Sequence, residues 1–153
     1  MTDPDIDEAD PLPDGAAEFV QRQIEEEHGY LSWLNTRVES VERGRMVLTI
    51  PFDEKLTNAD GETIHGGVAA TLIDTAGGLA QQTAFDDPLS GGVATVNLNA
   101  NYLRPATGDL RAEAEVVRSG SSIGVSDMRV TSTSNGDTRE VVVGQGSFRL
   151  FRG

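Results

Sequence analysis

Apolar and polar residues alternate with the two-residue period of a β-strand through most of the second half of the chain. The alternation covers residues 92–106, 109–120, 122–134 and 138–151. Asn135-Gly136, between the last two segments, predicts a type I′ hairpin turn. In residues 92–106 the period divides the side chains between two faces. One face is expected to carry Val96, Leu98, Ala100 and Tyr102, and the other Thr95, Asn97, Asn99 and Asn101.

The first half of the chain combines helical spacings with one strand. Residues 15–35 place apolar side chains at mixed helical spacings, which predicts a short helix with Gly29 as its stop. Residues 44–52 alternate as a strand does, and Pro51 marks its end or an edge position. Residues 53–67 are expected to form a loop, with a turn at Asp60-Gly61.

Residues 66–84 are the strongest helix candidate. At 100° per residue, six apolar side chains fall within an arc of about 120°: Ala69, Leu72, Ile73, Ala76, Leu79 and Ala80. One long helix followed by antiparallel strands predicts an α+β fold, with the helix packed against a single sheet. The 153 residues fit one domain, residues 15–153, after an acidic, proline-punctuated segment, residues 1–14, that is expected to be disordered.

Asp74 lies on the helix face opposite the apolar arc. Its neighbours there are small or uncharged: Gly67, Ala70, Thr71, Gly77, Gly78 and Gln81. Each mid-helix glycine costs about 1 kcal/mol relative to alanine, which indicates a reason for keeping it. A partner chain's helix could approach this face, or a ligand could reach Asp74 across it. The simpler interpretation is a tight loop followed by an exposed surface acid.

The start of this helix offers backbone donors to a ligand. His65-Gly66-Gly67 falls where the first N–H groups of a helix lack an intrahelical partner. Glycine lets a ligand approach these donors without a Cβ in the way, and the helix dipole favours developing negative charge there. Donors at the start of a helix, with a carboxylate two turns further on, are the outline of a hydrolytic site.

Charge and composition narrow the function classes. The chain has 25 acidic and 12 basic residues, a formal net charge of −13, and Lys55 as its single lysine. This balance argues against nucleic acid or an anionic membrane as a partner. It is typical of proteins from salt-loving hosts, although an ordinary acidic cytosolic protein would also fit.

With no cysteine and only His28 and His65 as imidazoles, no metal site is expected. Without a signal peptide or a long apolar run, a cytoplasmic location is expected.

Two stretches carry a family resemblance. "NADGETIHGGVAATLIDTA" (58–76) and "GVATVNLNANYLRPA" (92–106) resemble the hotdog-fold acyl-CoA thioesterases of the phenylacetate-pathway (PaaI-like) type. The likeness extends from about residue 17 to 151. It implies a long central helix wrapped by a curved antiparallel sheet, and hydrolysis of an acyl-CoA without a metal or redox cofactor. It also implies homodimers, commonly paired into homotetramers, with active sites at the subunit interface.

The resemblance assigns roles to five residues. Asp74 matches the catalytic carboxylate, which acts as a general base on water or as a nucleophile. Gly66 matches the backbone N–H that polarises the thioester carbonyl. His65 and Asn58 match polar residues on the oxyanion side, and Thr95 matches a polar group near the attacking water. By resemblance, Asn58, His65 and Gly66 come from one subunit and Asp74 and Thr95 from its neighbour.

Each assignment has an alternative. His65 could simply cap or order the loop, and Thr95 could be a structural strand residue. In the relatives the loop asparagine stands six residues before the histidine, whereas Asn58 stands seven before His65. Asn97, Asn99 and Asn101 could form a polar subunit interface or a solvated face.

The phosphates of coenzyme A require local donors in so acidic a protein. Arginine and backbone N–H groups suit phosphate, so the expected substrate-binding residues are Gly67, Arg104, Arg118, Gly120, Ser121 and Ser122. A non-catalytic acyl-CoA binding or regulatory module on the same fold is the main alternative function. A hotdog dehydratase ranks last, because the His/Asp arrangement it requires is not found.

Overall fold

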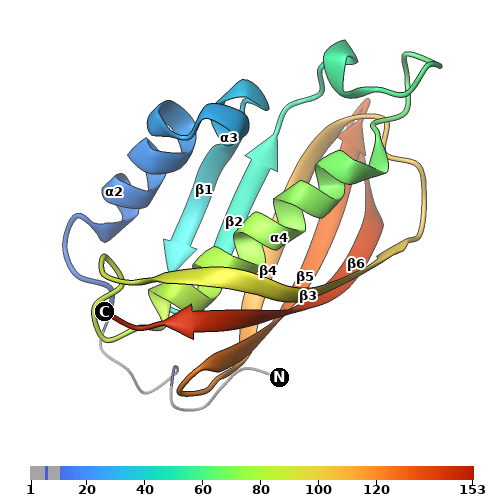
Figure 1. Ribbon diagram of the computed structural model, residues 1–153. Helices are drawn as coiled ribbons and strands as arrows, with labels where there is room; N and C mark the ends of the chain where they lie inside the picture. Colours follow the sequence, from blue (N-terminus) through green and yellow to red (C-terminus); the bar gives the residue numbers. More distant parts are fainter. Residues whose placement is uncertain (1–5, 7–10) are drawn as a thin grey trace.

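In the computed structural model, a six-stranded antiparallel sheet wraps around one long helix, α4 (Figure 1). The structure describes Ile6 and residues 11–153. The strand order is β1-β2-β4-β5-β6-β3. The strands are β1 (Arg37–Glu42), β2 (Arg45–Ile50), β3 (Gly92–Tyr102), β4 (Asp109–Ser119), β5 (Ile123–Ser134) and β6 (Asp137–Phe151). The helical elements are α2 (Ala16–Arg22), a π-helical turn η1 (Gln23–Glu27), α3 (Gly29–Trp33), a 3₁₀ turn η2 (Glu54–Leu56) and α4 (Gly66–Thr83).

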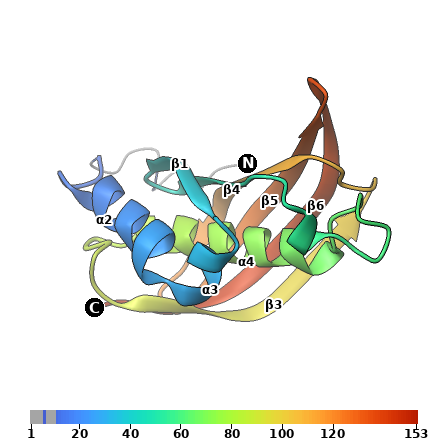
Figure 2. The same ribbon diagram turned by 90° about the horizontal axis from the view of Figure 1, so that it is seen from above.

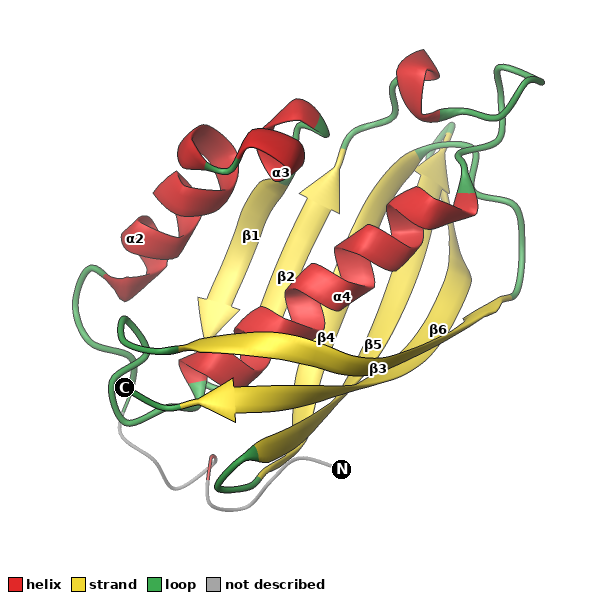
Figure 3. Cartoon of the chain, viewed as in Figure 1, coloured by secondary structure: helices red, strands yellow, loops and turns green. Residues whose placement is uncertain are grey.

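The α+β prediction is confirmed, and α4 lies in the concavity of the sheet (Figure 3). Helix α4 packs on β2, β3, β4, β5 and β6, which is why it is buried on more than one face. The predicted apolar arc forms its centre: Leu72, Ile73, Ala76 and Ala80 are fully buried. In Figure 1, α2 and α3 lie to one side of α4, near β1, and β3 lies to the other. Viewed from above, α4 lies between β3 and the strands β4 and β5 (Figure 2). None of the helices described is long and apolar enough to cross a membrane.

The two mid-helix glycines of α4, Gly77 and Gly78, are explained by packing within the chain. A Cβ on Gly77 would lie 2.9 Å from Met128 Sδ and 2.9 Å from Phe148 Cζ, and one on Gly78 would lie 3.1 Å from a methyl group of Val93. Strands β3, β5 and β6 therefore press directly on this part of the helix. For Gly77 the expectation that a partner or ligand covers the residue was wrong, because side chains of the same chain cover it, whereas Gly78 also lines a cavity beside Asp74. Asp74 lies one turn earlier, where α4 is only partly buried.

Strand β3 contains a bulge that reverses its alternation. Thr95 pairs with Phe148 and Asn97 with Ser147, which leaves Val96 as the extra residue. Thr95 consequently faces α4 together with Leu98, and Val96 is 62% exposed. The predicted division of this strand was wrong for Thr95 and Val96, because a strict period of two cannot anticipate a bulge. The hairpin prediction is supported by positive φ at both Asn135 and Gly136 (52° and 78°).

The helical segment near the N-terminus is divided. The prediction of Gly29 as a helix stop was wrong, since η1 ends at Glu27 and Gly29 begins α3. His28 separates the two elements and caps α3, with Nδ1 accepting a hydrogen bond from the Leu31 N–H at 3.2 Å. Strand β1 was not predicted. The disordered segment predicted for residues 1–14 falls largely on residues 1–5 and 7–10, outside the described residues, whereas Ile6 packs against the core.

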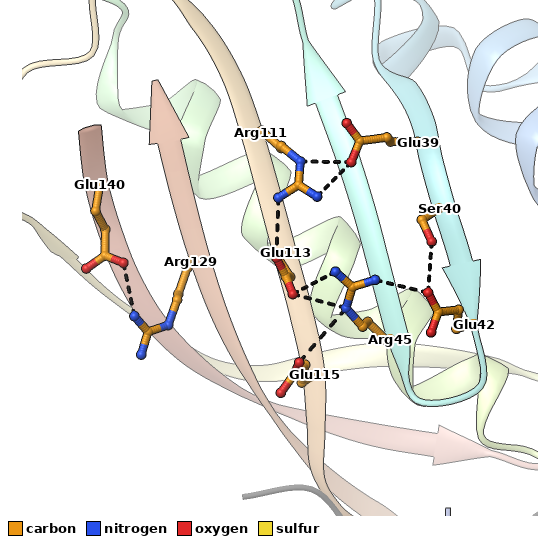
Figure 4. Close-up of polar contacts among 9 residues, drawn as sticks. All are labelled: Glu39, Ser40, Glu42, Arg45, Arg111, Glu113, Glu115, Arg129 and Glu140. Atoms are coloured by element: carbon orange, nitrogen blue, oxygen red, sulfur yellow. Dashed lines mark hydrogen bonds and ion pairs between the residues drawn. The ribbon is translucent and has the colours of Figure 1, made fainter. Parts of the chain in front are cut away.

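The outer face of the sheet carries a network of ion pairs (Figure 4). Arg45 contacts Glu113 at 2.8 Å, and Arg111 contacts Glu39 at 2.7 Å and Glu113 at 3.3 Å. The hydrogen bonds from Arg45 hold the pKa of Glu113 below its ordinary value. The bonded carboxylates raise the pKa of both arginines. On the β1–β2–β4 part of the sheet, the four glutamates are thus paired with guanidinium groups: Glu39, Glu42, Glu113 and Glu115.

Candidate active site

The side chain of His65 caps the first turn of α4 and leaves the Gly66 N–H without an intrachain partner among the described residues. His65 is the N-cap, and its Nδ1 accepts a hydrogen bond from the Gly67 N–H at 2.8 Å. The Gly66 N–H has no hydrogen-bond partner among the described residues, as expected for the first residue of a helix. Tyr102, at the end of β3, donates its hydroxyl to the Gly66 carbonyl. The Gly66 N–H is therefore a fixed donor available to a ligand.

The loop before α4 is ordered by its own backbone hydrogen bonds. The Asn58 N–H donates to the Thr63 carbonyl at 2.8 Å, and the Asn58 carbonyl accepts from the Gly61 N–H at 3.0 Å. The Asp60 carboxylate accepts from the N–H groups of Glu62 and Thr63, and these bonds lower its pKa. The loop leaves the Asn58 side chain exposed at the rim of a cavity of about 390 Å³, which His65, Gly66 and Tyr102 also line.

Asp74 and Thr95 meet on the other exposed part of α4. The Thr95 hydroxyl donates to Asp74 Oδ1 at 2.6 Å, and Asp74 Oδ2 has no hydrogen-bond partner among the described residues. The bulge at Val96 makes this contact possible, because it turns Thr95 toward the helix. Both residues line a cavity of about 420 Å³. Its apolar wall comes from η1, α3, α4, β3 and β6: Ile24, Leu31, Leu79, Val93 and Phe148.

Within one chain, the five predicted catalytic residues form two groups. Asn58, His65 and Gly66 line one cavity, and Asp74 and Thr95 line the other. Gly66 and Asp74 are eight residues apart on α4, which corresponds to about 12 Å along the helix axis. One chain alone therefore does not bring the Asp74 carboxylate to a carbonyl group held at the Gly66 N–H.

The predicted phosphate-binding residues lie at opposite ends of α4. Arg104 lines the cavity at the Gly66 end and donates to the Glu140 carbonyl at 2.9 Å. Arg118 lies near the other end, where its carbonyl accepts from buried Gln81 at 3.3 Å. In the adjoining loop, the carbonyls of Gly120 and Ser122 accept hydrogen bonds from Arg152 and Arg149, while Ser121 is exposed. Gly67 is exposed beside His65. The structure does not bring these residues together within one chain.

Sequence reasoning missed several residues of these cavities. Tyr102 was correctly predicted to lie on the side of β3 that is turned toward α4. Its hydrogen bond to the Gly66 carbonyl was not predicted. Gln23, Glu27 and His28 line the Asp74 cavity, and no local pattern places them there.

The described residues contain no group of three or more histidine or acidic side chains able to hold a metal ion.

Comparisons with known proteins assign the chain to a family. Residues 61–138 match the model of the Thioesterase superfamily, which is about half of the chain. A protein of Halobacterium salinarum provisionally named an esterase is 51% identical over 144 residues, covering 91% of this chain and 95% of that protein. Human acyl-coenzyme A thioesterase 13 is 30% identical over 95 residues, covering 61% of this chain and 65% of that protein.

The fold agrees with a solved structure of the expected type. The PaaI protein from the phenylacetic acid degradation operon of Escherichia coli superposes with a TM-score of 0.75, at 22% identity, covering 90% of this chain and 94% of that one. A likeness at this identity bears on the fold alone, and it identifies the helix wrapped by its sheet as the hotdog fold. The family match and the archaeal relative show that this chain belongs to the thioesterase superfamily and is a thioester hydrolase.

Proposed function

We propose that the protein hydrolyses acyl-CoA thioesters to a free acid and CoA, with Asp74 as the general base or nucleophile. The observation that carries this proposal is the Asp74–Thr95 pair at a largely apolar cavity, with one carboxylate oxygen that no described residue hydrogen-bonds. The family supports the reaction type, and the relative named acyl-coenzyme A thioesterase 13 supports the substrate class. The apolar wall suits the acyl group, which in a small cavity would be an aryl or medium-length chain.

In the general-base route, Asp74 Oδ2 takes a proton from water while the water oxygen bonds to the thioester carbon. The charge that develops on the carbonyl oxygen is stabilised by the Gly66 N–H at the positive end of α4. The C–S bond then breaks, and the CoA sulfur takes the proton that Asp74 had accepted from water, so that CoA leaves as the thiol. In the nucleophilic route, an Asp74 oxygen bonds to the carbon first, the C–S bond breaks and CoA leaves as the thiolate. Water then hydrolyses the acyl–Asp74 anhydride, which releases the acid and restores the carboxylate, and the proton set free is taken up by the thiolate. The Thr95 hydroxyl orients the carboxylate in both routes.

We infer that the complete site needs two chains. Strand β3 is an edge of the sheet, 11 residues long, with exposed Val96 and Tyr102. A second copy pairing along this edge would remove unpaired backbone groups from water. It would also allow Asn58, His65 and Gly66 of one chain to face Asp74 and Thr95 of the other. The expected assembly is a homodimer, or a homotetramer made of two such dimers.

An acyl-CoA panel tests the activity. The purified protein is incubated with aryl-, medium- and long-chain acyl-CoA, and free thiol is detected. Asp74→Asn and Asp74→Ala are expected to lose most of the turnover, whereas Asp127→Asn, a carboxylate on the outer face bonded to Gln145, should retain it. The proposal would be refuted if no acyl-CoA in the panel released free thiol, or if both Asp74 variants kept full turnover. Oxygen-18 incorporation in a single turnover separates the two routes.

Mixing two inactive variants tests the shared site. Asp74→Asn and His65→Ala subunits are unfolded together and refolded as mixed dimers. If each site uses one residue from each chain, mixed dimers regain one intact site, and the mixture exceeds the activity of either parent. Activity no higher than the parents would argue for a site within one chain.

A non-catalytic acyl-CoA binding module remains the alternative function. Saturable binding of acyl-CoA without any release of thiol would favour it.

A further inference from the structure

Two large aromatic side chains of α3 are exposed side by side. Tyr30 and Trp33 are three residues apart on the helix, so they share one face. Their exposed fractions are 52% and 57%. Only 5% of the chain is aromatic, and Trp33 is its single tryptophan. An exposed aromatic surface of this kind is typical of a binding site rather than of a solvated helix face.

The only lysine of the chain lies on this tryptophan. Lys55 Nζ is 4.3 Å from the centroid of the Trp33 ring, and it also donates to the Trp33 carbonyl. Among the described residues Lys55 forms no ion pair with a carboxylate, whereas Arg45, Arg111 and Arg129 do. The aromatic face and the ammonium group thus form a unit, called here the Trp33–Lys55 platform, whose ammonium group is not paired with a carboxylate in the part of the chain that the structure describes.

The platform lies beside the start of α4. The hydroxyl groups of Tyr30 and Thr71 are hydrogen-bonded at 2.8 Å, and Thr71 donates to the Gly67 carbonyl at 3.0 Å. On the other side, Lys55 precedes Leu56, whose carbonyl accepts the His65 N–H at 2.8 Å. Two short chains of contacts therefore connect the platform to the turn that carries the Gly66 N–H donor.

We propose that the Trp33–Lys55 platform binds the phosphorylated adenosine end of the acyl-CoA substrate. This inference rests on the proposed function. A purine ring stacks on an exposed indole, and an ammonium group beside it suits a phosphate. A substrate carrying several phosphate charges is repelled by a protein of net charge −13. A cation near the site that is not paired with a described carboxylate would attract those phosphates and favour binding. The thioester reaches the Gly66 N–H through the flexible pantetheine arm.

Tryptophan fluorescence tests the platform without requiring turnover. Because Trp33 is the only tryptophan, the emission of the protein reports on this position alone. Adenosine 3′,5′-bisphosphate is expected to quench it saturably, and Lys55→Gln should weaken that binding about tenfold. Arg129→Gln, which removes a cation from the outer face, serves as the matched control and should bind as the wild type does. Absence of saturable quenching would overturn the inference.

Kinetics with two substrates separates this inference from the proposed function. Trp33→Ala and Lys55→Gln are expected to raise KM for acyl-CoA about tenfold with little change in kcat, and to leave KM for the same acyl-pantetheine unchanged. Trp33→Phe should retain most of the affinity. If neither substrate is hydrolysed, the proposed function fails. The fluorescence titration with adenosine 3′,5′-bisphosphate then still tests whether the platform binds a nucleotide. If acyl-CoA is hydrolysed with an unchanged KM in both variants, the inference fails alone. It also fails if Trp33→Ala dissociates the oligomer in light scattering, because the platform would then be a subunit contact.

Discussion

The substitution Gly77→Ala should destabilise the protein, although it places the best helix former in the middle of a helix. In an open helix, alanine would stabilise by about 1 kcal/mol relative to glycine. At this position the added Cβ would lie 2.9 Å from both Met128 Sδ and Phe148 Cζ. Both side chains are almost completely buried and cannot move without disturbing their neighbours. Overpacking of a dense core costs about 1–3 kcal/mol, and two displaced buried groups favour the upper half of that range. A net loss of about 1–2 kcal/mol is expected.

Urea unfolding followed by far-UV circular dichroism measures this loss. Protein and salt concentrations must be equal for all variants, because assembly and ion binding shift the apparent stability. Gly78→Ala is the matched control one residue away. Its Cβ would approach only one methyl group, on partly buried Val93, at 3.1 Å, with Phe148 at 3.5 Å. Its stability should stay within about 0.5 kcal/mol of the wild type. A Gly77→Ala variant as stable as the wild type, or more stable, would refute the packing explanation for this glycine.

Three further predictions follow from the hydrogen bonds. Because Arg45 lowers the pKa of Glu113, the stability from this pair is present above the ordinary pKa of 4.5 and is lost as the pH falls below it. Glu113→Gln should therefore lose less stability than the wild type in urea titrations between about pH 5 and about pH 3; equal losses would contradict this. Asp60→Ala should speed amide hydrogen exchange at residues 62 and 63 and lower kcat/KM, since the carboxylate orders the loop that carries Asn58; unchanged exchange would contradict that role. His28→Ala should cost about 1 kcal/mol by removing the cap of α3, whereas His28→Asn should retain it; equal urea midpoints for the two variants would exclude the capping role.

Several elements could be predicted because their signals are local. The apolar arc of residues 66–84 predicts one side of α4 that meets the sheet, since apolar side chains at that spacing line one continuous stripe. The burial of Gly77, Gly78 and Gln81 on the opposite side could not be predicted in this way, because it depends on the curvature of the sheet around the helix. Asn135-Gly136 specifies a turn with two positive φ values, which few other dipeptides adopt. Strand β1 was missed because its six residues, "RVESVE", are half charged and carry no strict alternation.

The sequence indicated which residues belong to the candidate site, but it did not predict how they are arranged in space. His65 and Gly66 follow from the start of the helix, and Asp74 follows from its position opposite the apolar arc. The contact between Asp74 and Thr95 depends on a bulge, and a bulge is decided by how β3 pairs with β6 rather than by the residues around Val96. Likewise, the long-range fold brings Trp33 onto Lys55, 22 residues later in the chain.

The sequence by itself determined the α+β class, the long helix, the hairpin turn and the chemical groups at the start of α4. Each of these depends on periodicity or on backbone preferences within a few residues. Only the tertiary structure decided why Gly77 and Gly78 are there, which way Thr95 faces, and that Gly66 and Asp74 belong to separate cavities of one chain. These features arise from contacts between residues far apart in the sequence, such as Gly77 with Phe148. Their geometry follows from the curvature of the whole sheet around the helix.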